Sequence, residues 1–165
     1  MGRTTRREAE ARVLAALPSW VNAISQLNRL VAERIGVAAS DLDCLHALNR
    51  GGPATAAELV GQIGLTPGSV SRMIDRLDAA GCIKRTADPR DRRRVLIEPT
   101  ADGLARIAAY YDGLTARTRD DLTIFRLDEL ESLLRFIERS QRSAGDELAR
   151  LRHDHDSSGS PRTGT

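Results

Sequence analysis

The segment TPGSVSRMIDRLDAAGCIKRTADPRDRRRVLIEPT, residues 66–100, determines how the rest of the chain is interpreted. Its first half predicts a helix, because Thr66 is a favourable N-cap, Pro67 occupies the preferred first position and Gly81 stands at the far end. Its second half contains two short strand candidates, CIKRT and RVLIE, on either side of the charged loop ADPRDRR. The segment therefore predicts a helix followed by a β-hairpin with a long charged tip.

The predicted helix has one apolar and one polar face. Val70, Ile74 and Leu77 recur at helical spacing and are expected to be buried, with Met73 and Ala80 flanking them. The opposite face begins with small residues and becomes basic one turn later, which suits entry into the major groove of DNA. It consists of Gly68, Ser69, Ser71, Arg72, Asp75 and Arg76. An ordinary surface helix with a few arginines is the alternative interpretation of this face alone.

A second short helix is predicted immediately before this one. Thr55 and Glu58 have the spacing of a capping box, and the apolar residues that follow extend to Ile63 before Gly64. Two short helices joined by a tight turn that contains glycine are typical of a helix-turn-helix. Together with the hairpin, residues 40–99 are predicted to form a winged helix-turn-helix domain.

Helices are also predicted on both sides of this domain. A long amphipathic helix is expected over residues 6–35, with Pro18 kinking or breaking it, and Ser40 is expected to cap the helix that follows. Downstream, Thr100 is expected to cap a helix to about Asp121, and another is expected from about Asp128 to Arg152. Residues 6–35 and 100–152 are therefore assigned to a helical region outside this domain, which the family resemblance described below implies is a dimerisation region. The polar tail, residues 153–165, is predicted to be disordered.

Charge is distributed unevenly, although the net charge of the 165 residues is only +2. Residues 69–94 carry eight basic and four acidic side chains, whereas residues 100–165 carry ten basic and twelve acidic ones. A positive segment on a neutral to acidic body is typical of a protein that binds a polyanion. Lys84 is the only lysine, so the positions of the arginines are more informative than their number.

The charged loop of the hairpin suggests a role for each sign of charge. An arginine at the tip can enter the minor groove, where the negative potential of DNA is strongest. Asp88 and Asp91 are expected to accept hydrogen bonds from loop amides and to pair with neighbouring arginines, which would hold the tip rigid. A solvated charge cluster is the alternative, but it does not account for the position of the loop after a helix-turn-helix.

The stretch GSVSRMIDRLDAAGCIKRTADPRDRRRVLIEPTADG, residues 68–103, resembles the signature of the MarR family of bacterial transcriptional regulators. The resemblance covers roughly residues 10–150 and is densest across the recognition helix and the wing. The matching positions are Arg72, Asp75, Arg76, Leu77, Gly81, Arg85, Asp88, Pro89, Asp91, Arg92, Arg93, Thr100 and Gly103. The peroxide-sensing members of this family carry a reactive cysteine in the first helix, and no cysteine stands there in this sequence.

This resemblance implies a mainly α-helical protein with a small β-hairpin wing, flanked by long N- and C-terminal dimerisation helices. It implies a homodimer that binds a pseudo-palindromic operator in double-stranded DNA and represses neighbouring genes until a ligand or oxidant releases it. Arg93 is the residue we expect in the minor groove. The full set of residues predicted to bind DNA is Thr66, Gly68, Ser69, Ser71, Arg72, Arg76, Arg90, Arg92 and Arg93. A pocket for a small aromatic or anionic effector is predicted at Trp20, Ile24, Leu27 and His46, and simple core packing is the alternative interpretation of each of these residues taken singly.

Other classes of function find little support. The sequence contains no GxSxG motif, no P-loop and no nucleophile–base pair, so neither an enzyme nor a cofactor is expected. Cys44, His46 and Cys82 lack a fourth ligand for zinc, and His46 is expected to be a partly buried helix residue. Both cysteines are interpreted as small buried hydrophobic residues, with Cys82 the better candidate for a redox role because Lys84 and Arg85 are near. No apolar run approaches the ~20 residues of a membrane span, and we expect a cytoplasmic protein.

A winged-helix adaptor that binds proteins instead of DNA is the alternative function. Such an adaptor would gain little from a basic helix beside a basic wing.

Overall fold

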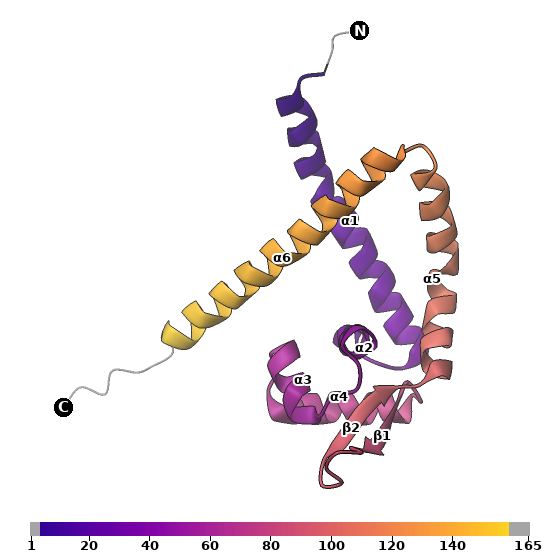
Figure 1. Cartoon of the computed structure of the whole chain (residues 1–165), viewed down its shortest axis with the longest axis vertical. Helices are drawn as coiled ribbons and strands as arrows, with labels where there is room; N and C mark the ends of the chain where they lie inside the picture. Colours follow the sequence, from indigo (N-terminus) through magenta and orange to yellow (C-terminus); the bar gives the residue numbers. More distant parts are fainter. Residues whose placement is uncertain (1–3, 159–165) are drawn as a thin grey trace, which may run out of the picture. The chain divides into compact units, whose positions relative to one another are not determined.

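A computed structural model describes residues 4–158, which form six helices and one two-stranded antiparallel sheet (Figure 1). One compact unit ends at Asp112 and a second begins at Gly113, so the two are described separately. The mainly helical fold with a β-hairpin wing is as predicted. The elements are α1 Arg6–Ile35, α2 Ala39–Gly51, α3 Ala56–Ile63, α4 Pro67–Ala79, β1 Ile83–Ala87, β2 Val95–Pro99, α5 Ala101–Leu122 and α6 Leu127–Ser158.

Local capping signals set most helix boundaries of the first unit. The Thr55 hydroxyl accepts a hydrogen bond from the Glu58 amide and the Glu58 carboxylate accepts one from the Thr55 amide, which confirms the predicted capping box. Thr66 likewise accepts from the Ser69 amide at the start of α4. Gly64 ends α3 with a φ of 72°, a left-handed conformation that glycine adopts without strain.

Two local predictions for this unit need correction. Ser40 does not cap α2, because the helix begins at Ala39 and its N-cap is Ala38, two residues before Ser40. The Asp41 carboxylate takes over part of that role and accepts a hydrogen bond from the Ala38 amide at 2.9 Å. Pro18 lies inside α1 without breaking it, since the helix runs continuously from Arg6 to Ile35.

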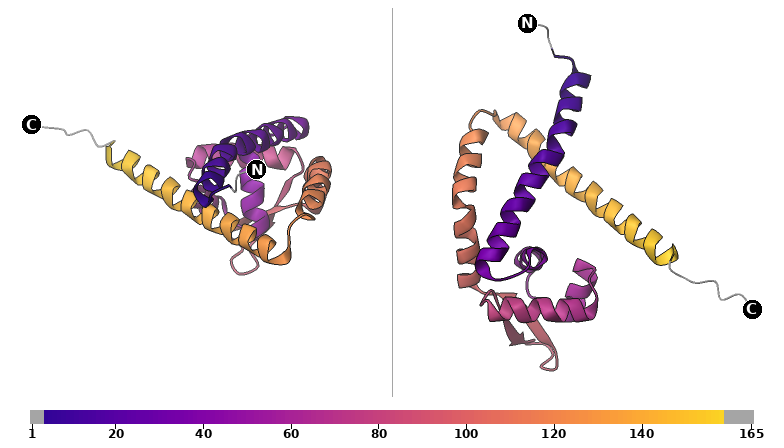
Figure 2. Two further views of the ribbon diagram at one scale, coloured as in Figure 1. Left: turned by 90° about the horizontal axis from the view of Figure 1, so that it is seen from above. Right: turned by 180° about the vertical axis from the view of Figure 1, so that it is seen from behind.

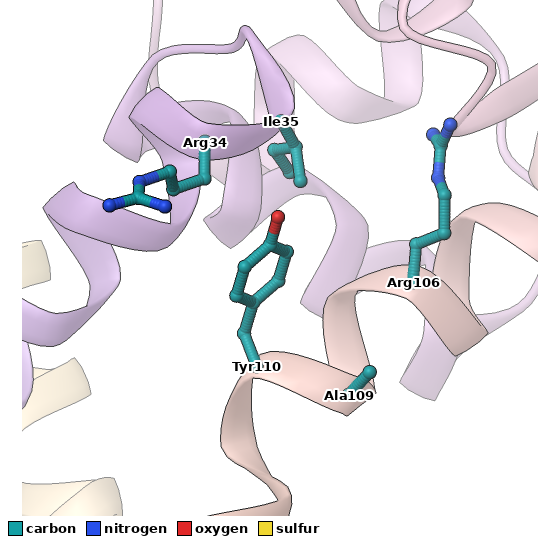
Figure 3. A pocket seen from close by; sticks show the side chains of 5 residues that line it. All are labelled: Arg34, Ile35, Arg106, Ala109 and Tyr110. Carbon is teal, nitrogen blue, oxygen red and sulfur yellow. The ribbon is translucent and has the colours of Figure 1, made fainter.

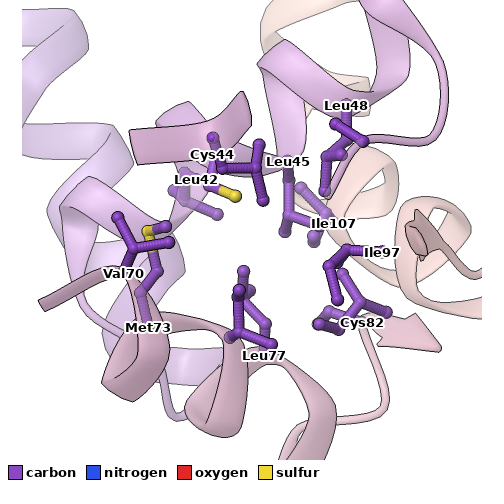
Figure 4. Packing of buried hydrophobic residues seen from close by; sticks show 14 of the residues in the cluster. Leu42, Cys44, Leu45, Leu48, Val70, Met73, Leu77, Cys82, Ile97 and Ile107 are labelled. Atoms are coloured by element: carbon purple, nitrogen blue, oxygen red, sulfur yellow. The ribbon is translucent and has the colours of Figure 1, made fainter. Parts of the chain in front are cut away.

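A single apolar core holds the helix-turn-helix and the hairpin together (Figure 4). The predicted apolar face of α4 is buried in it: Val70, Met73, Ile74 and Leu77 are at most 3% exposed. These side chains share the core with Leu42, Cys44, Leu45 and Leu48 of α2, Leu59 of α3, and Cys82, Ile83 and Ile97 of the hairpin segment. Burial of one complete face leaves the opposite face of α4 exposed to solvent.

The hairpin pairs Ile83 with Pro99 and Ala87 with Val95 in antiparallel register. It is joined to the segment before α3, because the backbones of Ala54 and Ile97 exchange two hydrogen bonds of 3.2 and 2.8 Å. Through this bridge the base of the wing is anchored on the helix-turn-helix.

The start of α5 is bonded to the chain that leaves α4. The Thr100 hydroxyl donates to the carbonyl oxygen of Gly81 at 2.7 Å and accepts from the Gly103 amide at 3.0 Å, as expected for the cap of α5. Gly103 lies so close to the Cys82 backbone that a Cβ on it would stand 2.6 Å from the Cys82 Cα. Only glycine therefore fits at this position without a shift of the backbone.

The second unit contains the last part of α5 and all of α6. The atypical residue Arg126 does not prevent the start of α6, since its amide donates to the Glu129 carboxylate at 2.8 Å. The helix continues to Ser158, so the prediction of a disordered tail is wrong for residues 153–158. The remaining predicted tail, residues 159–165, lies outside the described residues. Among residues 4–158 no helix is both long and apolar enough to span a membrane.

Both cysteines are completely buried in the core, as predicted. Burial, together with the negative charge of Asp41, raises the pKa of the Cys44 thiol to about 11. The thiolate is the reactive form of cysteine, so such a thiol is protected both by its surroundings and by its protonation. Cys82, the better redox candidate by sequence, is also removed from solvent.

We expect neither thiol to react with iodoacetamide in the folded protein at pH 8. With a pKa of about 11, only about one Cys44 side chain in a thousand carries the thiolate at that pH, and Cys82 is sterically shielded. Mass spectrometry would count the alkylated cysteines, and guanidinium-unfolded protein, in which both should react, is the control. Rapid alkylation of either cysteine in the folded state would contradict this expectation.

Candidate nucleic-acid interface

The exposed face of α4 presents hydroxyl groups and one basic side chain. Thr66, Gly68, Ser71 and Arg72 are exposed, and Ser69 is half-buried. The Ser69 hydroxyl accepts hydrogen bonds from the Thr66 hydroxyl at 2.9 Å and from Arg72 Nη2 at 3.4 Å. A Cβ on Gly68 would approach only the Arg72 side chain, at 3.9 Å, so the surface in front of this glycine is open.

Arg76 has a partner that the sequence analysis did not identify. Its Nε and Nη2 atoms donate to the two carboxylate oxygens of Asp41 at 2.8 and 2.7 Å. Asp41 is completely buried at the start of α2, whereas the Arg76 side chain stays 42% exposed. The guanidinium that was predicted to bind DNA is therefore held in a two-pronged ion pair within the unit.

The two aspartates of the wing loop accept backbone hydrogen bonds at its tip. Asp88 accepts from the Arg90 amide at 2.8 Å, and Asp91 accepts from the Arg93 amide at 3.0 Å. The Asp88 amide donates to the Arg94 carbonyl, and the Arg94 amide donates to the Asp91 carbonyl. The carboxylates that look unfavourable beside DNA are thus directed towards the loop backbone.

Two further arginines of the motif connect the hairpin to the helices. Arg94 pairs with Glu58 of α3 at 2.7 Å and lies 3.8 Å from Asp88. Arg85 of β1 pairs with Asp75 and Asp78 of α4. Sequence reasoning identified Glu58 as a helix cap but missed its second role, because its partner stands 36 positions further along the chain.

The remaining arginines of the loop have no such partner. The guanidinium groups of Arg90, Arg92 and Arg93 are exposed and make no ion pair or hydrogen bond with any residue between 4 and 158. The arginines of residues 76–94 therefore fall into two groups. Arg76, Arg85 and Arg94 form ion pairs within the first unit, whereas Arg90, Arg92 and Arg93 remain available to a partner.

The helix and the wing tip face the same side of the first unit. α4 buries Val70, Ile74 and Leu77 in the core, so Ser71 and Arg72 on the opposite side of the helix are exposed. Arg76 also lies on the polar face but reaches back to Asp41 of α2. In Figures 1 and 2 the tip of the hairpin projects past α4 on the side away from α1 and α2. Arg72 and the three free arginines of the tip thus form two basic projections on one side of the unit.

Of the four residues predicted to line an effector pocket, His46 lines a cavity in whose lining Trp20, Ile24 and Leu27 do not take part. His46, predicted to be partly buried, is exposed and lines a cavity of about 230 Å³ between α2 and α5. Trp20, Ile24 and Leu27 lie on α1, and Trp20 is 62% exposed. The cavity is lined by His46 together with Leu42, Leu45, Asn49, Leu104, Ile107, Ala108 and Tyr111.

A second cavity, of about 420 Å³, lies between the end of α1 and α5 (Figure 3). Its lining includes Arg34, Ile35, Arg106 and Tyr110. The Tyr110 ring points towards Ile35, whereas the two guanidinium groups point in different directions. The cationic side chains therefore do not converge on one point within this cavity. Among the described residues, no group of three or more His, Cys, Asp or Glu side chains is arranged to hold a metal ion.

Comparison with known proteins agrees with this geometry. The model of the MarR family matches residues 35–94, which span the helix-turn-helix and most of the wing. The uncharacterised HTH-type transcriptional regulator YcgE of Bacillus subtilis (strain 168) is 35% identical over 125 residues, which cover 76% of this chain and 81% of that protein. The HTH-type transcriptional repressor NicR of Pseudomonas putida is 34% identical over a shorter stretch, 39% of this chain and 41% of NicR.

Solved structures show the same fold. The MarR family transcription regulator SP03579 has a TM-score of 0.61 at 22% identity, covering 87% of this chain and 95% of that one. The YusO protein of Bacillus subtilis has a TM-score of 0.58 at 20% identity, covering 84% and 99%. From the similarity to YcgE over most of both chains and the family match across the winged helix-turn-helix, we conclude that this chain belongs to the MarR family of transcriptional regulators.

Proposed function

We propose that this chain regulates transcription by binding double-stranded DNA, with α4 in the major groove and the wing tip at the minor groove. The observation that carries the proposal is that Arg72 is exposed on α4 and that Arg90, Arg92 and Arg93 are free in the loop of the wing, whose tip projects past α4 (Figure 1). Their charges are not neutralised within the described chain, so they are available to phosphates and base edges. Arg72 can offer a two-pronged hydrogen bond to guanine from the exposed face of α4.

The small residues beside Arg72 support the same placement. Gly68 and Ser71 add little bulk, so the helix backbone can approach base edges closely. The hydroxyl of Thr66 and the amides at the start of α4 can meet a phosphate. An adaptor that binds only proteins would not require cations on both the helix and the wing.

We further propose that the active form is a homodimer. Long helices outside the winged helix-turn-helix expose large apolar side chains, namely Val13, Leu14, Trp20 and Val21 on α1 and Leu134, Ile137, Leu148 and Leu151 on α6. Large apolar side chains exposed along a helix in this way favour an interface with a partner. A twofold dimer would carry two recognition helices, which suits a pseudo-palindromic operator with half-sites about one helical turn, ~34–36 Å, apart.

Repression and release by an effector complete the proposal. Similarity to NicR, which is named a repressor, favours repression. The cavity beside His46 is the site we propose for a small aromatic or anionic effector, because its walls are mainly apolar and include the His46 and Tyr111 side chains.

Binding to duplex DNA at increasing salt tests the main proposal. A regulator that contacts several phosphates should bind mixed-sequence duplex DNA at low salt and lose affinity steeply as salt rises, because each contact releases counterions. Fluorescence anisotropy with a labelled duplex would measure both affinity and slope. An adaptor would show neither binding nor a salt-dependent slope, and that result would refute the proposal.

Replacement of Arg93 by alanine tests the wing. Arg93→Ala should weaken DNA binding without lowering the melting temperature, because its side chain has no partner among the described residues. Arg7→Ala is the matched control: it removes one exposed arginine from the first turn of α1, at the end of that helix away from the wing (Figure 1). Equal affinities of the two variants in a mobility-shift assay would remove Arg93 from the interface.

Truncation tests the dimer. A chain that ends at Ser143 lacks Leu148 and Leu151, two exposed apolar residues of the last part of α6. We expect its dimer to dissociate at concentrations at which the full chain remains dimeric, as measured by sedimentation velocity. An unchanged dimer would place the interface elsewhere on the chain.

A further inference from the structure

Arg76, which was predicted to bind DNA together with Arg72, has the geometry of an intramolecular ion pair. Arg76 uses both Nε and Nη2 on Asp41, at 2.8 and 2.7 Å, so the plane of the guanidinium matches the plane of the carboxylate. Arginine in this two-pronged arrangement fixes orientation as well as distance.

Asp41 is fully engaged on the other side of the contact. Besides Arg76, it accepts from the Ala38 amide at 2.9 Å and lies 3.5 Å from the Ser40 hydroxyl. The side chain is completely buried, and no buried polar side-chain atom among the described residues lacks a hydrogen-bond partner. A buried carboxylate in this position depends on Arg76 for its neutralising charge.

The location of the pair determines what it can control. It joins the first turn of α2 to the last turn of α4, two helices that both contribute side chains to the apolar core. Apolar burial is non-directional and tolerates small rotations of a helix about its own axis. An ion pair with two parallel hydrogen bonds does not tolerate such rotations, so it can fix the direction in which Ser71 and Arg72 project.

We propose that Arg76 acts in DNA recognition as a positioning residue, held by Asp41, rather than as a contact to DNA. The inference rests on the proposed DNA-binding function and adds an acidic residue, Asp41, to the groups that binding requires. It makes a prediction opposite in sign to that of a direct contact. If Arg76 bound phosphate, removal of the Asp41 charge would free the guanidinium and strengthen binding.

The experiment compares Asp41→Asn, Arg76→Gln and the double variant with the wild-type chain. The probe is a duplex that the wild-type protein selects from a random-sequence library, and affinity is measured at several salt concentrations. Asp41→Asn and Arg76→Gln should each weaken binding by about tenfold or more, the effect of one misplaced base contact. The double variant should lose little more than either single one, because both changes break the same interaction.

The salt dependence separates positioning from contact. Both single variants should keep the wild-type slope of log affinity against log salt, whereas loss of a phosphate contact would reduce the slope by about 0.9. Arg72→Gln is the comparison for a proposed direct contact, and it should change the sequence preference of binding. Arg76→Gln should weaken binding without changing which sequence is preferred. Unchanged or stronger binding by Asp41→Asn, or a reduced slope for Arg76→Gln, would overturn the proposal.

Circular dichroism would show whether the variants fold. If the asparagine and glutamine variants unfold, Arg76→Lys provides the test, because lysine keeps the charge but not the two-pronged geometry. It should bind at least about tenfold more weakly than wild type, and full affinity would overturn the proposal. A wild-type chain that binds no duplex would refute the DNA-binding function itself. This result differs from one in which the wild type binds and Asp41→Asn binds equally well, which would refute only the positioning role.

Discussion

Burial of Val70, Ile74 and Leu77 is the constraint on which the rest of the first unit depends. These side chains lie on one face of α4, so their removal from water decides which residues of the same helix remain outside. Ser71 and Arg72 are exposed because they are opposite that face. The core that receives α4 also receives Ile83 and Ile97 of the hairpin, and the wing is thereby placed beside the recognition helix.

The arginines of residues 66–100 serve two purposes: some form ion pairs within the first unit, and others remain exposed. Arg76, Arg85 and Arg94 each meet a carboxylate from another element, so their charges connect α4 with α2, β1 with α4 and the wing loop with α3. Asp88 and Asp91 accept from amides of the loop itself. The cations left over are concentrated at the tip, which explains how a chain with a net charge of only +2 can present a strongly basic surface.

Local signals made most of the fold predictable, and distant contacts limited the rest. Thr55, Thr66 and Gly64 set helix ends through hydrogen bonds or backbone angles within a few residues, so their effects can be inferred from neighbouring letters. The partner of Arg76 stands 35 positions earlier in the chain. Periodicity shows which face an arginine occupies, but it does not show which carboxylate will meet it after folding.

The errors in the predictions from sequence have separate causes. Ser40 is a better cap than Ala38 by residue type, yet Asp41 satisfies the Ala38 amide from within the helix. The end of α6 was placed too early because polar composition was taken as disorder, although polar side chains are compatible with a helix that remains exposed. For the effector, the residues proposed from α1 did not line the cavity beside His46, since its walls come from α2 and α5.

The contact between Gly103 and Cys82 has a mechanical consequence. The first turn of α5 has no side chain to act as a spacer there, and Thr100 bonds the same stretch of backbone. α5 therefore cannot slide past the end of α4 without breaking these hydrogen bonds. A displacement of the first turn of α5 would therefore act directly on Gly81 and Cys82, the residues that connect α4 to the wing.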